Sequence, residues 1–223
     1  MDPQTGGIIA MAALPSYDPV KFAKYDKALY KNPAVADTYE PGSTFKVLTM
    51  SAALDAGVVR PDTHCDICTG QVDIGQYNVR TWDNKYRPDA TMTEVIQHSD
   101  NIGMVFVGQK LGKDKMYEYL KKFGIGSPTG IDLQEESSPQ LRPADKWADI
   151  DLATISFGQG IATTAIQMVR AVGAIANGGI LMQPRVVKSI LGETTVDLPP
   201  KQIRRVVSAQ AARQMTDMLV NAV

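Results

Sequence analysis

EPGSTFKVLTMSAALDAG, residues 40–57, predicts a buried helix around which the rest of the chain can be arranged. Ser43 is a favourable N-cap residue, the residues after it favour helix, and Gly57 is a favourable C-terminal stop. Apolar residues lie on nearly every side of this helix, which is typical of a helix in the middle of a domain rather than on its surface. A chain of 223 residues is long enough for one large domain that encloses such a helix.

Ser43 and Lys46 lie three positions apart, so their side chains share one face of the predicted helix. A serine hydroxyl is a poor nucleophile until a neighbouring base takes its proton, and a lysine can do so only when it is neutral. Burial lowers the pKa of a lysine, and a helix N-terminus favours negative charge near the serine. The pair therefore predicts an acyl-transfer nucleophile, although a capping serine and a solvated lysine would show the same spacing.

Ser99-Asp100-Asn101 lies between two predicted helices, one that opens with a capping box at Thr91 and runs towards His98, and one that begins at Ile102. A second hydroxyl near the nucleophile can relay a proton, and a carboxamide can fix both the lysine and a substrate amide. S-x-x-K followed by S-D-N is typical of penicillin-binding proteins and class A β-lactamases, in which K-T-G completes the set. Helix capping explains either motif alone, but the two in this order favour catalysis.

The whole chain resembles the transpeptidase domain of monofunctional, class B penicillin-binding proteins. The segments that carry the resemblance are residues 1–11, 40–46, 122–126, 129–133, 156–161 and 176–179. The resemblance implies that Ser43 is the acylated nucleophile and Lys46 its base. It also implies that Ser99 relays a proton and that Asn101 orients the substrate, while Asp100 is assigned no chemistry.

The resemblance implies a substrate as well. The family acylates its serine with a peptidoglycan stem peptide ending in D-Ala-D-Ala, releases D-Ala, and passes the acyl group to an amine on a neighbouring strand. β-Lactams resemble that substrate and acylate the same serine. We therefore expect these two ligand classes, other cell-wall synthesis proteins as partners, and no cofactor or metal. The expected location is the extracytoplasmic face of the bacterial cytoplasmic membrane, with a membrane anchor outside this chain.

The third motif of the family is missing from the sequence. No Lys-Thr-Gly, Lys-Ser-Gly or His-Thr-Gly occurs in it, and the chain closes on the apolar run Leu219–Val223 inside a predicted helix. In the family, that motif lies on a central strand, where it provides a cation, a hydroxyl and half of the oxyanion hole. We therefore expect residues 1–223 to be a single transpeptidase domain that is truncated at its C-terminal edge and is inactive or very weak by itself.

The fold class implied by the family is α+β, with an antiparallel sheet flanked by helices and a mostly helical lobe from about residue 60 to 160. Patterning predicts the elements. Strands are expected at 7–13, 180–190 and 202–207, further helices at 102–112, 114–123 and 164–176, a final helix capped by Ser208, and irregular stretches at 16–41, 58–90 and 126–150.

Composition gives few further constraints. Hydrophobic residues make up 44% of the chain and charged residues 21%, within the usual globular range, and the net charge of −1 gives no reason to expect a nucleic-acid partner. No signal peptide or membrane-spanning run is visible. Cys65 and Cys68 are too few for a zinc site and are followed by an extended pattern rather than a helix, so two unremarkable loop cysteines or a local disulfide are expected.

Two other function classes stay open. A hydrolase, either a β-lactamase or a D,D-carboxypeptidase, would use the same serine, although residues 40–42 and the later segments favour a transpeptidase. A non-catalytic module that keeps the fold is the second class, because K-T-G is absent. The lifetime of the acyl-enzyme separates the enzyme classes, since a transpeptidase holds a β-lactam for hours and a lactamase for seconds or less.

Overall fold

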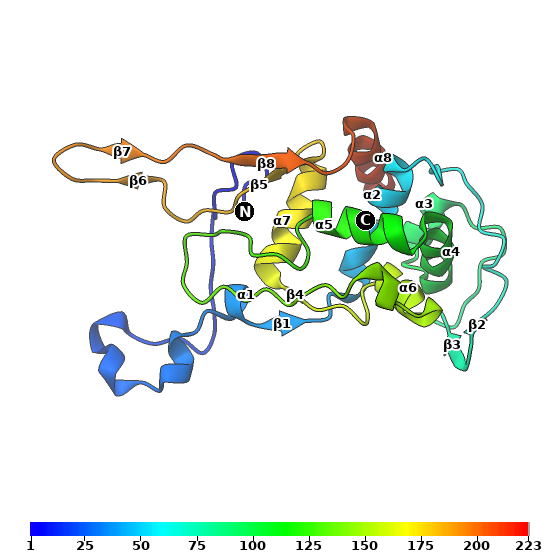
Figure 1. Ribbon diagram of the computed structural model, residues 1–223, viewed down its shortest axis with the longest axis horizontal. Coiled ribbons are helices and arrows are strands. Elements are labelled where there is room, and N and C mark those ends of the chain that lie inside the picture. Colours follow the sequence, from blue (N-terminus) through cyan, green and yellow to red (C-terminus); the bar gives the residue numbers. More distant parts are fainter. Residues whose placement is uncertain (223) are drawn as a thin grey trace.

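The computed structural model describes residues 1–222 and has α2 (Lys46–Asp55) in its interior (Figure 1). This helix packs against α4 (Asn101–Leu111), α5 (Lys113–Lys122), α7 (Ala165–Ala176) and α8 (Ala209–Val220). Its apolar sequence is explained by these contacts, because neighbours on several sides bury nearly all of its residues. The predicted buried helix is thus confirmed.

Ser43 is not the N-cap of this helix, which corrects the sequence-based prediction. It lies inside a 3-10 turn, η3 (Gly42–Phe45), that leads directly into α2. An N-cap residue needs extended dihedral angles, whereas both Pro41 and Phe45 already have right-handed helical angles. The main chain therefore enters the helix without a capping side chain, and Ser43 is left exposed to solvent.

The stretch from about 60 to 160, expected to be a mostly helical lobe, has its helices after residue 91. It contains the hairpin β2 (Val72–Ile74) and β3 (Tyr77–Val79), then α3 (Met92–Gln97), α4 and α5. The capping box at the start of α3 is present, because Thr91 and Glu94 each bond to the other's main-chain N–H. Gly112 and Gly124 end α4 and α5 with positive φ values of 80° and 81°, as expected of C-terminal glycines.

One helix of the lobe was not predicted. α6 (Asp149–Ser156) follows a short 3-10 turn, η4 (Ala144–Lys146), in a region expected to be irregular up to residue 150. Its Leu152, Ala153 and Ile155 are buried, and the helix packs against α4. Only eight residues long, it depends on this tertiary packing more than on local propensity.

The strands form antiparallel pairs, as the α+β class predicts, although each described sheet holds two strands rather than one continuous set. The pairs are β1 (Thr38–Tyr39) with β4 (Thr163–Thr164), β2 with β3, β5 (Ile180–Met182) with β8 (Gln202–Arg205), and β6 (Ser189–Ile190) with β7 (Val196–Asp197). The long strand predicted for 180–190 is divided into β5 and β6. Pro184, which has no N–H to donate, lies in the break.

The buried strand predicted for residues 7–13 is wrong. Gly7 forms an isolated bridge with Arg185, and the following residues have no regular structure. Ile9 is 78% exposed. A buried strand needs neighbours along its edges and over its faces, and within residues 1–222 the only strand-like partner of this segment is the main chain around Arg185.

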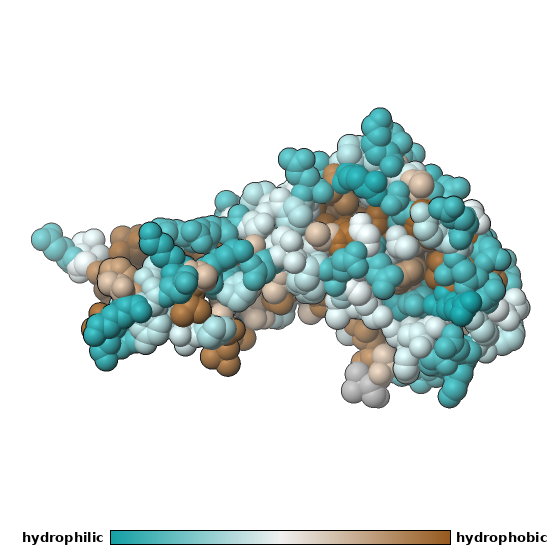
Figure 2. Space-filling view, turned by 90° about the horizontal axis from the view of Figure 1, so that it is seen from below, coloured by the Kyte–Doolittle hydropathy of each residue, from teal (hydrophilic) through white to brown (hydrophobic). Residues whose placement is uncertain are grey.

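The N-terminal excursion (residues 16–32) projects from the rest of the molecule at the lower left of Figure 1, and the β6–β7 hairpin projects above it. The excursion contains η1 (Pro19–Lys24) and η2 (Lys27–Tyr30), whereas the helix that follows it, α1 (Pro33–Ala36), packs against α7. Figure 2, seen from below, shows apolar residues mixed with hydrophilic ones over this end of the molecule. Both projections therefore carry exposed apolar side chains away from the main core.

The final helix begins where expected, since Ser208 caps α8 by accepting a hydrogen bond from the N–H of Ala211. Cys65 and Cys68 form a disulfide and are both buried, which selects the local disulfide from the two alternatives. Among residues 1–222, no helix is long and apolar enough to cross a membrane.

Candidate active site

Ser43 and Lys46 are held at the start of α2 by the turn that precedes it. The main-chain N–H of Lys46 donates to the carbonyl of Ser43, so the two residues are separated by one tight turn. The Ser43 side chain faces solvent, whereas Lys46 is only 2% exposed. The turn thus brings together an accessible hydroxyl and a buried amine.

Three oxygen atoms surround the Lys46 amine. Lys46 Nζ donates to the main-chain carbonyl of Ser99 at 2.6 Å, to Ser99 Oγ at 3.0 Å, and to Asn101 Oδ1 at 2.8 Å. An ammonium group has three protons, so these acceptors satisfy all of them. The structure therefore joins Lys46, Ser99 and Asn101 in one cluster, although more than fifty residues separate the lysine from the other two.

Burial lowers the pKa of Lys46 to about 8, and the nearby carboxylate of Asp100 acts in the opposite direction. A lysine with a pKa close to neutrality is neutral in a useful fraction of molecules and can accept a proton from a nucleophile. A lowered pKa is the condition under which Lys46 is predicted to act as a base.

Asp100 has a role that the sequence analysis did not assign. It is buried and caps α4, because its Oδ1 accepts hydrogen bonds from the N–H groups of Ile102 and Gly103. An aspartate directly before an apolar helical run is a recognisable N-cap, so this signal was present in the sequence. The cap sets where α4 begins and hence where Asn101 lies.

Ser99 has an unusual backbone conformation, with a positive φ of 52°. Few residues other than glycine adopt this left-handed region, and such conformations are often found at functional sites. Here it lies in the short connection between α3 and α4, and both the carbonyl and the hydroxyl of Ser99 contact the same amine. Backbone strain of this kind cannot be read from the motif.

Asn101 uses both ends of its amide. Its Oδ1 accepts from Lys46, and its Nδ2 donates to the carbonyl of Arg80 at 3.0 Å. The two contacts fix which end of the amide faces the lysine. Asn101 thereby links the cluster to the segment that follows the β2–β3 hairpin.

A glycine-containing loop after α6 supports the turn that holds Ser43. The N–H of Gly42 donates to the carbonyl of Gly158 at 2.9 Å, and the N–H of Gly160 donates to Glu40 Oε1 at 2.9 Å. Gly158 has a φ of 83°, and a Cβ built there would lie 2.1 Å from the Gly42 oxygen. The residues on both sides lie in segments that resemble the family, but the sequence does not predict this contact, since nothing local indicates which distant turns will meet.

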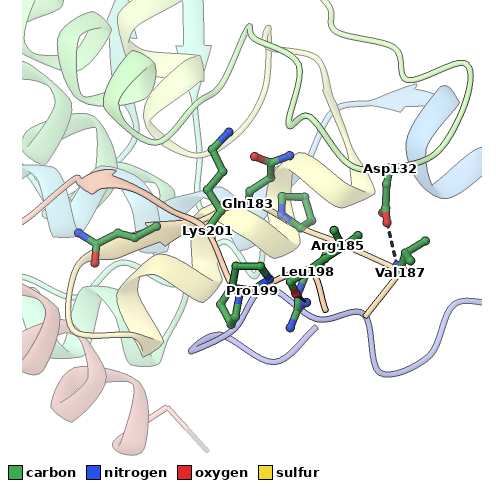
Figure 3. Close-up of a pocket in the computed structure, with 10 residues that line it drawn as sticks. Asp132, Gln183, Arg185, Val187, Leu198, Pro199 and Lys201 are labelled. Atoms are coloured by element: carbon green, nitrogen blue, oxygen red, sulfur yellow. Dashed lines mark hydrogen bonds between the residues drawn. The ribbon is translucent and has the colours of Figure 1, made fainter. Parts of the chain in front are cut away.

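Figure 3 shows a different hollow, of about 560 Å³, beside the Asp132 loop and the connection from β5 to β6. The Asp132 carboxylate accepts hydrogen bonds from the main-chain N–H groups of Val186 and Val187. None of the four predicted site residues lines this hollow. Among residues 1–222, no group of three or more histidine, cysteine, aspartate or glutamate residues is placed to hold a metal ion.

Known proteins are similar to this chain over its whole length. The penicillin binding protein transpeptidase domain family matches residues 1–223. Stage V sporulation protein D of Bacillus subtilis is 36% identical over 228 residues, which cover 100% of this chain and 35% of that protein. The chain thus spans about a third of the length of the curated relatives it matches.

Two solved structures show that the fold is shared as well. Penicillin binding protein 3 of Mycobacterium tuberculosis, complexed with aztreonam, has a TM-score of 0.90 and 33% identity, covering 98% of this chain and 49% of that one. The D,D-transpeptidase domain of a peptidoglycan glycosyltransferase from Eggerthella lenta has a TM-score of 0.93 and 27% identity, covering 100% and 60%. Sequence, motif order and fold agree, and the chain belongs to the penicillin binding protein transpeptidase domain family.

Proposed function

We propose that this chain is part of a peptidoglycan D,D-transpeptidase, that Ser43 is its nucleophile, and that Lys46 is the base. The observation that carries the proposal is the cluster in which the buried Lys46 amine contacts Ser99 and Asn101, one turn away from the exposed Ser43. The relatives support the reaction class, since the Eggerthella lenta structure is titled a D,D-transpeptidase domain.

In the proposed acylation, Ser43 Oγ attacks the carbonyl carbon of the penultimate D-Ala of a stem peptide. Neutral Lys46 takes the hydroxyl proton, and the Ser99 hydroxyl, 3.0 Å from Lys46 Nζ, can pass a proton on to the departing amine of the terminal D-Ala. An amine of a second stem peptide then attacks the ester and restores the serine. A β-lactam would acylate Ser43 through its ring amide, whose nitrogen takes the proton and stays attached to the acyl group; penicillin binding protein 3 of Mycobacterium tuberculosis has been solved in complex with the β-lactam aztreonam.

Asn101 is proposed to orient the acyl-donor peptide. Its amide is already fixed by Lys46 and the Arg80 carbonyl, so it presents a set geometry rather than a mobile one. Fixed polar groups accelerate a reaction because they need not reorganise as charge develops. The family resemblance gives Asn101 this role, and its two contacts are consistent with it.

We further propose that the active protein combines residues 1–223 with a strand that carries a Lys-Thr-Gly-type motif, and that the domain faces the outside of the cytoplasmic membrane. The sequence of this chain has no such motif. The substrate class, an extracytoplasmic polymer, sets the proposed location. If the complete gene product lacked an anchor and fractionated with the cytosol, this location would be wrong.

The test is covalent labelling of the longer protein with a labelled penicillin, followed by peptide mapping. We expect the label on the peptide that contains Ser43, no label in Ser43→Ala, and an acyl-enzyme that lasts for hours. Label on another residue, or equal labelling of Ser43→Ala, would refute the assignment of the nucleophile. Release of the label within seconds would instead favour a β-lactamase-type hydrolase.

A further inference from the structure

A groove of about 350 Å³ adjoins Asn101, between the β2–β3 hairpin and α6. One wall is the hairpin and the residue that follows it, and the other is α6 with the loop after it. The lining residues are Tyr77, Asn78, Val79, Arg80, Asn101, Ile150, Thr154, Phe157 and Gln159. The groove thus combines apolar side chains, a single cation and the amide that contacts the candidate base.

The Arg80 side chain is held in place by a short chain of hydrogen bonds. Asn78 Nδ2 donates to Asp73 Oδ1 at 2.6 Å, which turns Asn78 Oδ1 towards Arg80 Nε, 2.8 Å away. Asp73 therefore acts on Arg80 through an amide and forms no direct ion pair with it. Orientation by a neutral amide leaves the charge of the guanidinium uncompensated.

Among residues 1–222, the two terminal nitrogens of Arg80 have no hydrogen-bond partner. Within residues 1–222, Arg80 makes no ion pair, and its only side-chain hydrogen bond uses Nε. By contrast, Arg87 and Arg142 each pair with an aspartate within 3 Å. A guanidinium whose Nε is anchored keeps two parallel donors free, the arrangement that binds a carboxylate with two hydrogen bonds.

The main chain of Arg80 is tied to the reaction centre. Its carbonyl accepts from Asn101 Nδ2 at 3.0 Å, and Asn101 Oδ1 in turn lies 2.8 Å from Lys46 Nζ. One side chain therefore separates Arg80 from the candidate base. Asn101 and Arg80 also line the same groove, so the groove adjoins the amide that contacts the candidate base.

We propose that Arg80 determines specificity by binding a carboxylate on the acyl side of the donor peptide. This inference rests on the proposed transpeptidase function. The ligand is an acidic peptide arm whose aliphatic part packs against Ile150 and Phe157, while the exposed Gln159 offers an amide to its backbone. Lining by aliphatic and aromatic side chains with a few fixed polar groups is the usual composition of a small-ligand site.

The test uses two thioester donors and the longer transpeptidase. The donors are N-adipoyl-D-alanyl-thioglycolate, whose arm ends in a carboxylate, and its adipoyl monoamide, whose arm ends in a carboxamide of nearly the same shape. Attack by Ser43 releases thioglycolate in both cases, so free thiol reports acylation. We expect Arg80→Gln to lower kcat/KM for the carboxylate donor by about 10- to 30-fold and to change that for the monoamide by less than about twofold.

Two further variants sharpen this result. Arg80→Lys keeps the charge without the paired donors and should recover only part of the selectivity. Lys85 is an exposed cation five residues after Arg80 and forms no ion pair within residues 1–222. Lys85→Gln should therefore leave kcat/KM for both donors unchanged.

Equal losses with the two donors would overturn the inference, because they would show that Arg80 only supports Asn101. Unchanged kinetics in Arg80→Gln would overturn it as well. If neither donor acylated Ser43 of the unaltered protein, the proposed function itself would fail and the inference with it. Acylation of Ser43 by both donors at equal rates would contradict the inference alone.

Discussion

The two ends of the molecule differ in how they bury their apolar side chains. Around α2 and α4, buried residues form one continuous core that also includes residues of α5, α6, α7 and α8. At the other end, within residues 1–222, the N-terminal segment forms only an isolated bridge and the strands after α7 pair only in twos, and Ile9, Ile190 and Val196 are exposed. The helical end is enclosed, and the strand end is open.

This difference matters for chemistry because the candidate base lies at the enclosed end. The pKa of Lys46 is lowered by burial, and burial is supplied by the packed helices around it. Two-stranded sheets are marginal by themselves, and they gain stability when further strands or a helix pack against them. The helical end can therefore preorganise Lys46, Ser99 and Asn101 without the sheet. We propose that the completed sheet binds the C-terminal carboxylate of the donor peptide and the oxyanion.

The largest expected effect comes from completing the open end. Loss of the third-motif cation removes a charge-assisted contact of about 1.5–3 kcal/mol, and loss of an oxyanion donor costs about 2.7–4 kcal/mol of barrier. Together these slow acylation by roughly a thousand- to a hundred-thousandfold. We expect residues 1–223 to react with penicillin that much more slowly than the longer protein, as measured by mass spectrometry. Comparable rates would mean that the third motif is supplied by another route.

The next effect isolates the enclosed end. Lys46→Ala in the longer protein should slow acylation by at least about a hundredfold, the usual loss for a positioned base. The acylation rate of the unaltered protein should rise with pH and level off above about 8, where Lys46 is neutral. An acylation rate that does not change between about pH 6 and pH 9 would show that Lys46 is not the base.

The lowered pKa of Lys46 also predicts how the free energy of unfolding depends on pH. Its folded pKa of about 8 lies below the ordinary value of 10.5, so between these values the unfolded chain binds more protons than the folded one. The free energy of unfolding should therefore rise with pH across this window, and the cost of burying the charge is fully present below pH 8. Urea unfolding at several pH values checks the direction, and Lys46→Ala should lose this pH dependence.

The sequence predicted the enclosed end well because its signals are local. Caps at Thr91 and Ser208 form as expected, and Gly57 follows α2 with a φ of 67°. The contact between Lys46 and the S-D-N segment was expected only through the order of the motifs. No local rule gives that contact, because the residues meet through the packing of α2 against α4.

The open end was predicted less well for a physical reason. An apolar run such as residues 7–13 becomes a buried strand only when other strands and helices cover it, and those neighbours come from distant parts of a chain. Ser43 shows the same limit on a smaller scale, since its turn is set by the Gly158 carbonyl rather than by its own capping preference. Propensity identified the residues, and tertiary contacts decided their conformation.

A smaller effect should come from the turn that holds Ser43. In Gly158→Ala the new Cβ would clash with the Gly42 carbonyl, so the main chain must move, and we expect a loss of about 2–4 kcal/mol in the free energy of unfolding. Gly178→Ala is the matched control, since it has a φ of 61° and nothing within 4 Å of the new Cβ. It should cost only about 1 kcal/mol, from backbone strain. Equal losses in urea unfolding would show that the Gly158 contact adds nothing to stability.

The smallest expected effect tests the open end directly. Ile9 is 78% exposed, so Ile9→Ala in residues 1–223 should change the free energy of unfolding by no more than about 0.5 kcal/mol. The matched variant at the enclosed end, Ile155→Ala, removes the same atoms from a side chain that is 2% exposed and should cost about 2–5 kcal/mol.

Repeating Ile9→Ala in the longer protein sharpens the comparison. A cost that rises to about 1 kcal/mol or more would show that further strands cover this segment, because only burial makes the lost methyl groups matter. A cost as large as that of Ile155→Ala already in residues 1–223 would contradict the division into an enclosed and an open end.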